Sequence, residues 1–403
     1  MKKFLAYIYI ISWVLYELQD VIYSSGIVSK LALFFYLGIS IVYFFKCLSE
    51  LQLTNYIKGL NLLLLLFTIY GTVLILSGDK LTLGAAQVPV ASYSYLKYIY
   101  LSLLPFFPFY YFFNKGILNK DNLTSLLVLF LIVAIVCFYD QQKNSILNAE
   151  LLGLDSTENN NNAGYIFLSL IPGLAIFTSK PRFQYVILGV CSIFIILSMK
   201  RGAMLIGSVI IALFIFRNNK SLWKTNRLRV VILSLGVIGI MYYAISYLSS
   251  TSDYFINRYY DTMNGDSSHR DELYTYFLNH FTNNNNVLQQ FFGEGANATI
   301  KIFYNYAHND WIEILINQGV LGVFCFIWFW LCYYKDWRIS KKLLSNNVAL
   351  GIGLFFLSFL LKTLFSMSYA SISFGANCFL AYYMTELSDA KHNYKIKINN
   401  SVE

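Results

Sequence analysis

The chain has 403 residues, of which 57% are hydrophobic and only 13% are charged. Soluble domains carry about 25% charged residues, so this sequence has too few to cover a water-exposed surface. A soluble protein is therefore excluded. The net charge of +9 is better understood as basic residues distributed across a membrane than as a nucleic-acid-binding surface.

Apolar segments along the chain predict an all-α polytopic membrane protein with about 12 transmembrane helices. A helix crosses the hydrocarbon core with roughly 20 residues, and unpaired backbone groups exclude open strands there. The predicted spans are 4–19, 31–49, 59–77, 96–113, 123–139, 164–179, 184–199, 203–216, 230–248, 309–333, 348–366 and 371–386. Bends are expected where proline interrupts the fourth and sixth spans, at Pro105, Pro108 and Pro172.

The first span resembles a signal peptide, because two lysines precede an apolar run. Trp13, Tyr16 and Glu17 occupy the place of a small-residue cleavage site, so we expect the span to be retained. With the N-terminus in the cytoplasm, both termini lie there. Twenty of the thirty Lys and Arg residues then fall on the cytoplasmic side, as the positive-inside rule requires.

This orientation divides the chain into four regions. Residues 1–248 hold the first nine spans, 249–307 form a large external (periplasmic) loop, 308–386 hold the last three spans, and 387–403 form a cytoplasmic tail. The six cysteines all lie in or beside apolar segments, so we expect neither a disulfide framework nor a metal site.

The large external loop carries signs of regular structure. Ser267 or Ser268 is placed to cap an amphipathic helix that has acids in its first turn, and whose aromatic face would lie on the membrane or close over a cavity. Residues 292–295 then predict a turn. Arg270 falls in the first turn of that helix. Arg258 lies upstream among tyrosines, where we favour structural cation–π packing over a role in catalysis.

Basic residues also stand in the hairpin between the seventh and eighth spans. Lys200 and Arg201 are expensive to hold near a membrane. They either extend to lipid headgroups or form an anion site, for which the planar fork of arginine is suited. Lys362, late in the eleventh span, is more typical of a lysine that extends to the membrane surface.

The tenth span opens with His308 and continues with Asn309, Glu313 and Asn317 at a spacing of four. Such a polar stripe inside a membrane helix faces either a cavity or a partner helix. A histidine at this point is suited to act as a general base or to orient a hydroxyl group. The dipole of the helix favours its neutral form.

Three segments resemble one known family. Residues 308–312 with 318–322 resemble the "HN, aromatic, apolar run, G-apolar-x-G" signature of the O-antigen polymerase and O-antigen ligase superfamily. Residues 198–203 resemble its "SRGA" hairpin, with Lys200 where a small or polar residue is usual.

The third segment is the external loop, where residues 268–274 and 293–295 resemble the family's "SxR … GxG" pattern. The three motifs keep the family's order and topology over about residues 160–335. Residues 1–150 match the family only in hydropathy.

The resemblance implies a GT-C-like, metal-independent, inverting glycosyltransferase of the bacterial inner membrane that needs no cofactor. An acceptor hydroxyl would attack the anomeric carbon of a glycan carried by undecaprenyl pyrophosphate. By position, Arg201 and Arg270 would hold the pyrophosphate, and His308 would activate or orient the hydroxyl. The neighbouring residues expected to bind substrate are Lys200, Arg258, Asn309 and Glu313.

Within the superfamily, a polymerase adds the glycan to another lipid-linked repeat unit, and a ligase adds it to lipid A–core. We favour the polymerase, because the hairpin and the Asn-rich loops are typical of polymerases. The resemblance then implies a chain-length regulator as partner. A flippase for lipid-linked oligosaccharide is the alternative from another class. Flippases usually have two related halves with short outer loops, whereas this chain has a single large external loop.

Overall fold

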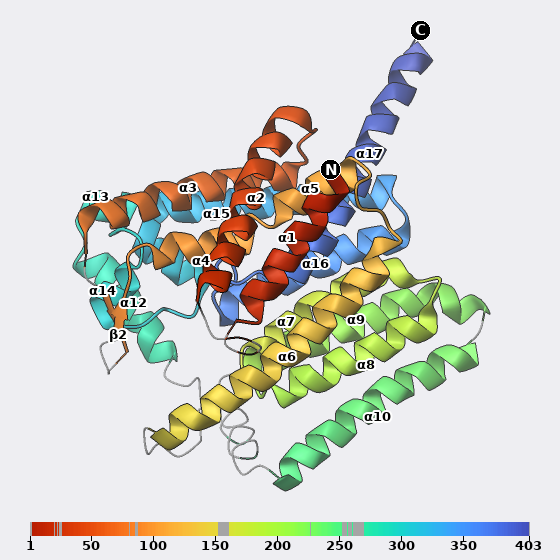
Figure 1. Ribbon diagram of the computed structural model, residues 1–403, viewed down its shortest axis with the longest axis horizontal. Coiled ribbons are helices and arrows are strands. Elements are labelled where there is room, and N and C mark those ends of the chain that lie inside the picture. The colour runs from red at the N-terminus through yellow and green to blue at the C-terminus, as the bar shows by residue number, and fades with distance from the viewer. Residues whose placement is uncertain are drawn as a thin grey trace.

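The computed structural model describes residues 2–19, 21, 23, 26–79, 81–84, 88–151, 161–225, 227–251, 256, 260 and 270–402. Over these residues the chain is a bundle of helices with one small strand pair (Figure 1). An all-α membrane protein is therefore confirmed as the fold class.

Helices occur wherever the sequence predicts a span. The first nine predicted spans correspond to α1 (Lys2–Glu17), α2 (Ile27–Glu50), α3 (Asn55–Ser77), α4 (Ser94–Leu103) with α5 (Phe106–Asn114), α6 (Asn122–Leu151), α7 (Ala163–Leu170) with the 3-10 helix η1 (Ile171–Phe177), α8 (Pro181–Leu197), α9 (Arg201–Thr225) and α10 (Arg227–Thr251). The last three correspond to α15 (Asp310–Leu343), α16 (Asn346–Phe365) and α17 (Phe374–Val402).

Five of the described helices are long and apolar enough to cross a membrane: Ile27–Glu50, Asn55–Ser77, Asn122–Asn144, Asp310–Leu343 and Asn346–Phe365. At 1.5 Å per residue, 23 residues reach about 35 Å, which exceeds the hydrocarbon core of roughly 30 Å. Ala163–Phe177 and Pro181–Leu197 are shorter apolar helices. Several spans are thus supported, and the total of twelve stays a prediction.

Two of the three prolines expected to bend their spans interrupt the helix there. Pro105 separates α4 from α5, and Pro172 lies where α7 tightens into η1. Proline has no N–H to continue the helical hydrogen bonding, so the chain changes direction there. Pro108 instead lies buried within α5. The region predicted as a tail, residues 387–402, continues α17 without a break, and in Figure 1 that helix extends beyond the bundle.

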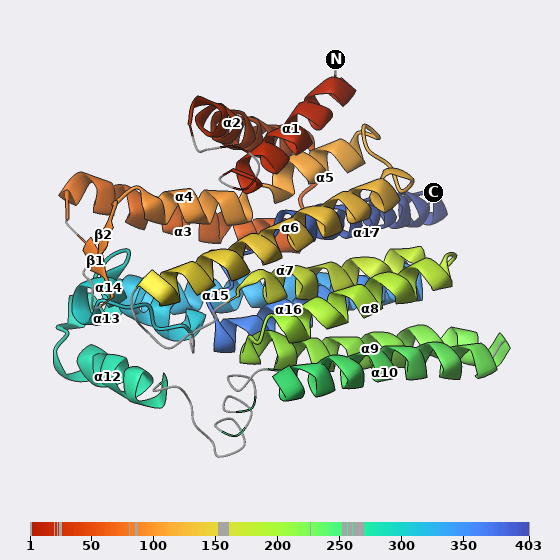
Figure 2. The ribbon, with the colours of Figure 1, turned by 60° about the horizontal axis from the view of Figure 1, so that its bottom comes forward.

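The predicted external loop, of which residues 270–307 are described without a gap, lies at one end of the bundle. It contains α12 (Arg270–Asn283), α13 (Val287–Phe292) and α14 (Ala298–Phe303), and beside it lies the antiparallel pair β1 (Leu81–Leu83) and β2 (Val88–Val90), in which Leu81 pairs with Val90. Figure 2 shows these elements together at the left, opposite the α9–α10 hairpin and the C-terminus.

The helix α12 confirms the predicted amphipathic helix. Its apolar face buries Leu273 and Phe277 against Ala298 and Ile316, so this face closes on the neighbouring helices and not on lipid. Ser267 and Ser268, the predicted caps, lie outside the described residues.

The loop is attached to α15 at a break in that helix. Gly319 has φ 66° and ψ −163° inside α15, and Gly293, at the end of α13, has φ 78° and ψ −177°. Both values lie in a region that is essentially restricted to glycine. The break frees two carbonyls of α15, and these accept the N–H groups of Glu294 and Gly295 at 3.0 Å each.

The two glycines also lie against each other. A Cβ atom on Gly319 would lie 2.4 Å from the backbone nitrogen of Gly293, and one on Gly293 would lie 2.4 Å from the carbonyl oxygen of Asn317. No side chain fits between these backbones. The predicted turn at residues 292–295 is therefore a backbone-to-backbone contact that joins the loop to the tenth predicted span.

Gly319→Ala should lower the melting temperature of the purified protein in detergent. The backbone conformation alone costs about 1–3 kcal/mol for a residue with a side chain, and the clash with Gly293 adds to it. Gly38→Ala in α2 is the matched control, because a Cβ there meets nothing within 4 Å. Equal melting temperatures for the two variants would contradict this account of the contact.

Candidate functional site

The side chain of Glu313 links the loop to α15 by hydrogen bonds, and we call this link the Glu313 strut. Glu313 is fully buried, and its carboxylate accepts hydrogen bonds from Thr299 Oγ1 (2.6 Å), the Ala307 N–H (2.8 Å) and Asn317 Nδ2 (3.1 Å). Buried polar groups are costly unless they are satisfied in this way. The carboxylate thereby ties α14 and the chain just before His308 to α15.

His308 lies in the chain between Ala307, which the Glu313 strut holds, and Asn309, which caps α15. Its φ of 54° is in the left-handed region, which is uncommon for a residue with a side chain. Asn309, the next residue, caps α15, because its Oδ1 accepts the N–H groups of Trp311 (2.9 Å) and Ile312 (3.4 Å). The fixed residues on both sides therefore set the direction of the imidazole.

The hairpin between α8 and α9 places Lys200 and Arg201 at the N-terminus of α9. Met199 has a left-handed φ of 50°, and Ser198 Oγ donates to the Ile195 carbonyl at 2.7 Å. A Cβ on Gly202 would lie 2.3 Å from the Tyr165 hydroxyl oxygen, so glycine is needed where the hairpin meets α7. Negative charge is favoured at such a helix N-terminus.

Arg270 connects the external loop to the end of α16. Its Nη1 donates to the carbonyl of Phe365 at 3.1 Å. The neighbouring Ser366 lines the cavity described below. The first residue of α12 is thus held beside the C-terminal end of α16, where carbonyl groups without helical partners accept hydrogen bonds.

Lys362 differs from expectation. The sequence suggested that it extends to the membrane surface, and this is wrong: the side chain is 7% exposed. Its Nζ donates to the carbonyl and hydroxyl of Ser371 at 2.9 and 2.8 Å, and lies 4.9 Å from the centre of the Tyr165 ring. The turn of α16 that carries Lys362 also carries buried Phe359 and Thr363, so the lysine faces inward.

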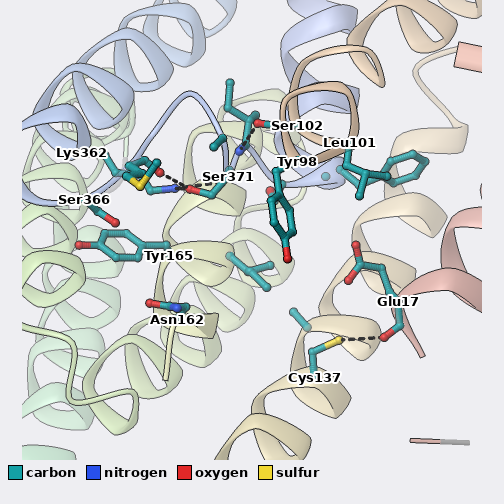
Figure 3. Close-up of a pocket in the computed structure, with 18 of the residues that line it drawn as sticks. Glu17, Tyr98, Leu101, Ser102, Cys137, Asn162, Tyr165, Lys362, Ser366 and Ser371 are labelled. Carbon is teal, nitrogen blue, oxygen red and sulfur yellow. Dashed lines mark hydrogen bonds between the residues drawn. The ribbon is translucent and has the colours of Figure 1, made fainter. Parts of the chain in front are cut away.

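These residues meet at a cavity of about 670 Å³. Lys200, His308 and Lys362 line it together with Tyr165 and Tyr306. In Figure 3 the Lys362 side chain enters from one side beside Tyr165 and Ser366. We call this side the cationic wall and define it by Lys200, His308, Lys362 and Tyr165.

A buried acid, Asp310, interacts with Lys362 of the cationic wall. Asp310 is fully buried and accepts the N–H groups of Ser368 (2.9 Å) and Tyr369 (3.4 Å), which fixes the turn that carries Ser371. Sequence reasoning missed Asp310 and Tyr165. The signal for Asp310 was its place directly after Asn309, whereas nothing in the sequence singled out Tyr165.

Other predicted site residues lie elsewhere. Asn309 and Glu313 are not among the cavity-lining residues, and their side chains are occupied by the cap and the strut described above. Arg201 and Arg270 also stand outside the lining, although Arg201 directly follows Lys200. Arg258 lies outside the described residues.

The electrostatics of the site act on His308. Burial, followed by the positive charges of Arg270 and Lys200, lowers the pKa of its imidazole to about 4. A histidine with this pKa is neutral at physiological pH. The site therefore combines fixed positive charge with a neutral imidazole, which suits an anionic group beside a hydroxyl.

The segment that holds most of these residues matches a known family. Residues 186–327 match the model of the O-antigen ligase family. The predicted resemblance to the O-antigen polymerase and ligase superfamily is confirmed. Lys200, Arg201, Arg270 and His308 all lie inside this match, and Lys362 lies beyond it. Members of this family are membrane enzymes that act on glycans. No curated protein matches the chain.

The low pKa of His308 predicts how the protein responds to acid. A histidine in the unfolded chain titrates near 6.5, whereas the folded one binds its proton only near pH 4. The unfolded state therefore binds more protons between these values. Stability should fall as pH drops from about 6.5 to about 4, and should show no contribution from His308 above that window.

Modification by diethylpyrocarbonate, located by peptide mass spectrometry, reports the neutral imidazole directly. For the wild type, the reactivity of His308 should fall with a midpoint near pH 4. Arg270→Gln removes one of the cations that lower the pKa, so its midpoint should be higher. His392, in the part of α17 beyond the bundle, should react equally in both proteins. An unchanged midpoint for His308 would show that Arg270 does not act on it.

Proposed function

We propose that this protein polymerises lipid-linked oligosaccharide repeat units into O-antigen or a related surface polysaccharide. The reaction would take place on the outer face of the bacterial inner membrane, with both termini in the cytoplasm. The donor is a glycan on undecaprenyl pyrophosphate, and the acceptor is a second lipid-linked repeat unit. The match to the O-antigen ligase family supports glycan chemistry in general.

The observation that carries the proposal is the cationic wall. Lys200 and Lys362 line the cavity beside His308, and Arg270 is close enough to influence that histidine. Negative charge grows on pyrophosphate as it leaves, so fixed cations bind the transition state more strongly than the ground state. Arg201 and Arg270 hold the pyrophosphate in this proposal, and Lys200 and Lys362 add to the same field.

In the reaction, the acceptor hydroxyl oxygen forms a bond to the anomeric carbon. The bond from that carbon to the phosphate oxygen breaks, and its electron pair leaves with undecaprenyl pyrophosphate. The hydroxyl proton is released to water. A histidine whose pKa is about 4 is a weak base. Its neutral ring nitrogen is therefore better suited to accept a hydrogen bond that orients the hydroxyl group.

A ligase is the second candidate, because the matched family is described by that activity. It would use the same donor site and the same displacement, with lipid A–core as the acceptor. The Ser198–Ala203 hairpin and the Asn-rich loops favour the polymerase. A chain-length regulator is the partner that polymerisation would imply.

Arg270→Ala should reduce chain extension on the order of 100-fold, the usual loss when one transition-state donor is removed. The chain and its variants would be expressed in the cognate strain, from which the native copy and the ligase have been deleted. Lipid-linked glycan is then separated by length on a gel. Wild type should give a ladder of many repeats, and Arg270→Ala mainly single repeats.

Arg338→Ala is the control, because Arg338 lies near the opposite end of α15 and should leave the ladder unchanged. Single repeats from the wild type, with transfer onto lipid A–core once that acceptor is supplied, would replace the polymerase with the ligase. Repeat units that accumulate on the cytoplasmic side when the chain is absent would replace both with a flippase.

A further inference from the structure

The cavity has a second wall of different chemistry. Opposite the cationic wall, α1, α2 and α6 contribute Trp13, Glu17, Tyr36 and Gln141 to its lining. Figure 3 shows Glu17 on the side away from Lys362, with Tyr98 between them. We call this side the acidic wall and define it by those four residues. Among the described residues that line the cavity, Glu17 is the only acid.

Glu17 is held in place without a cation. Its Oε1 accepts the indole N–H of Trp13 at 3.2 Å, and its backbone carbonyl accepts the Cys137 thiol at 3.9 Å. No Lys or Arg of the described residues forms an ion pair with it. The side chain is solvent-accessible, so the rest of the carboxylate is available to a ligand. The Glu17 carboxyl group carries no positive charge in either protonation state, and it repels phosphate when it is ionised, so this wall is unsuited to the pyrophosphate.

Ordered aromatic rings back the acidic wall, and two of them, Trp13 and Tyr36, are themselves buried. Trp13 stacks on Phe374 with ring centroids 4.3 Å apart and an interplanar angle of 7°, and Tyr36 packs on the same ring at 5.6 Å. Ordered rings with a few directed polar groups are typical of small-molecule sites. A carboxylate accepts short, strong hydrogen bonds from hydroxyl groups. An uncharged sugar offers both hydroxyl groups and an apolar ring face.

We propose that the acidic wall is the acceptor subsite, where Glu17 accepts hydrogen bonds from the sugar that is to be glycosylated. This inference rests on the proposed function and adds a location to it. The cationic wall takes the pyrophosphate end of the donor, and the acidic wall takes the uncharged end of the acceptor. The two substrates are then distinguished by charge, because the acidic wall disfavours the phosphate that the cationic wall binds.

The test separates the two walls with two probes. One is undecaprenyl pyrophosphate, which carries no sugar. The other is the repeat oligosaccharide released by mild acid from the lipid-linked pool of the cognate strain, which carries no phosphate. Binding of each probe to the full-length protein in lipid nanodiscs is measured by titration calorimetry. Glu17→Gln keeps the oxygen that accepts the Trp13 indole, so the local packing is preserved.

Glu17→Gln should weaken oligosaccharide binding at least about tenfold, the equivalent of one charge-assisted hydrogen bond. Its affinity for undecaprenyl pyrophosphate should stay within about twofold of wild type, since the probe has no sugar. Lys362→Met should show the reverse pattern. Glu50→Gln is the matched control, because that carboxylate lies at the far end of α2 and contacts Tyr111 and Lys115. It should change neither affinity.

Several outcomes would overturn the inference. Unchanged oligosaccharide binding in Glu17→Gln, or an equal loss for both probes, would remove Glu17 from an acceptor subsite. Another outcome is that the wild type binds undecaprenyl pyrophosphate and fails to bind the oligosaccharide. That result would contradict the acceptor subsite and would leave the proposed donor site intact. Binding of neither probe by wild type would instead contradict the proposed function. If Glu17→Gln does not fold, Tyr98→Phe is the second variant. It removes a hydroxyl group from the cavity lining and should weaken binding of the oligosaccharide alone.

Discussion

The position of the candidate site depends on the contact between Gly293 and Gly319. A break in α15 would leave carbonyl groups without donors in an environment that contains little water, which is costly. The external loop supplies those donors through Glu294 and Gly295, and only two glycines allow the backbones to approach closely enough. With the loop fixed there, the Glu313 strut determines where the chain re-enters α15 and hence where His308 stands.

Charge placement gives the cavity its character. A buried lysine is unfavourable unless its hydrogen-bonding groups are satisfied. Ser371 satisfies two donors of Lys362, and Asp310 lies near enough to interact with its charge. Lys200 and Arg270 add further positive charge on the same side of the cavity, beside His308. An arrangement of this kind is less stable than an apolar core of similar volume, which is why we assign it to ligand binding and not to stability.

Much of the helical bundle can be predicted from hydropathy, because each predicted span contains helix. Pro105 and Pro172 interrupt the helices of the fourth and sixth spans as expected. The amphipathic helix α12 and the turn at residues 293–295 also follow from local signals. Three features could not be predicted. The orientation of Lys362 depends on which face of α16 is covered, the use of Glu313 as a strut depends on groups far away in sequence, and Glu17 reaches the cavity only through the packing of α1 beside α6.

The order of synthesis also matters for this architecture. The ribosome makes the loop helices before α15, so Glu294 and Gly295 emerge before the carbonyls that they contact. The Phe365 carbonyl that accepts Arg270, and the Ser371 that holds Lys362, come later still. Phe374, against which Trp13 stacks, is made more than 350 residues after its partner. Neither wall of the cavity is therefore complete in a nascent chain until its last helices have been made.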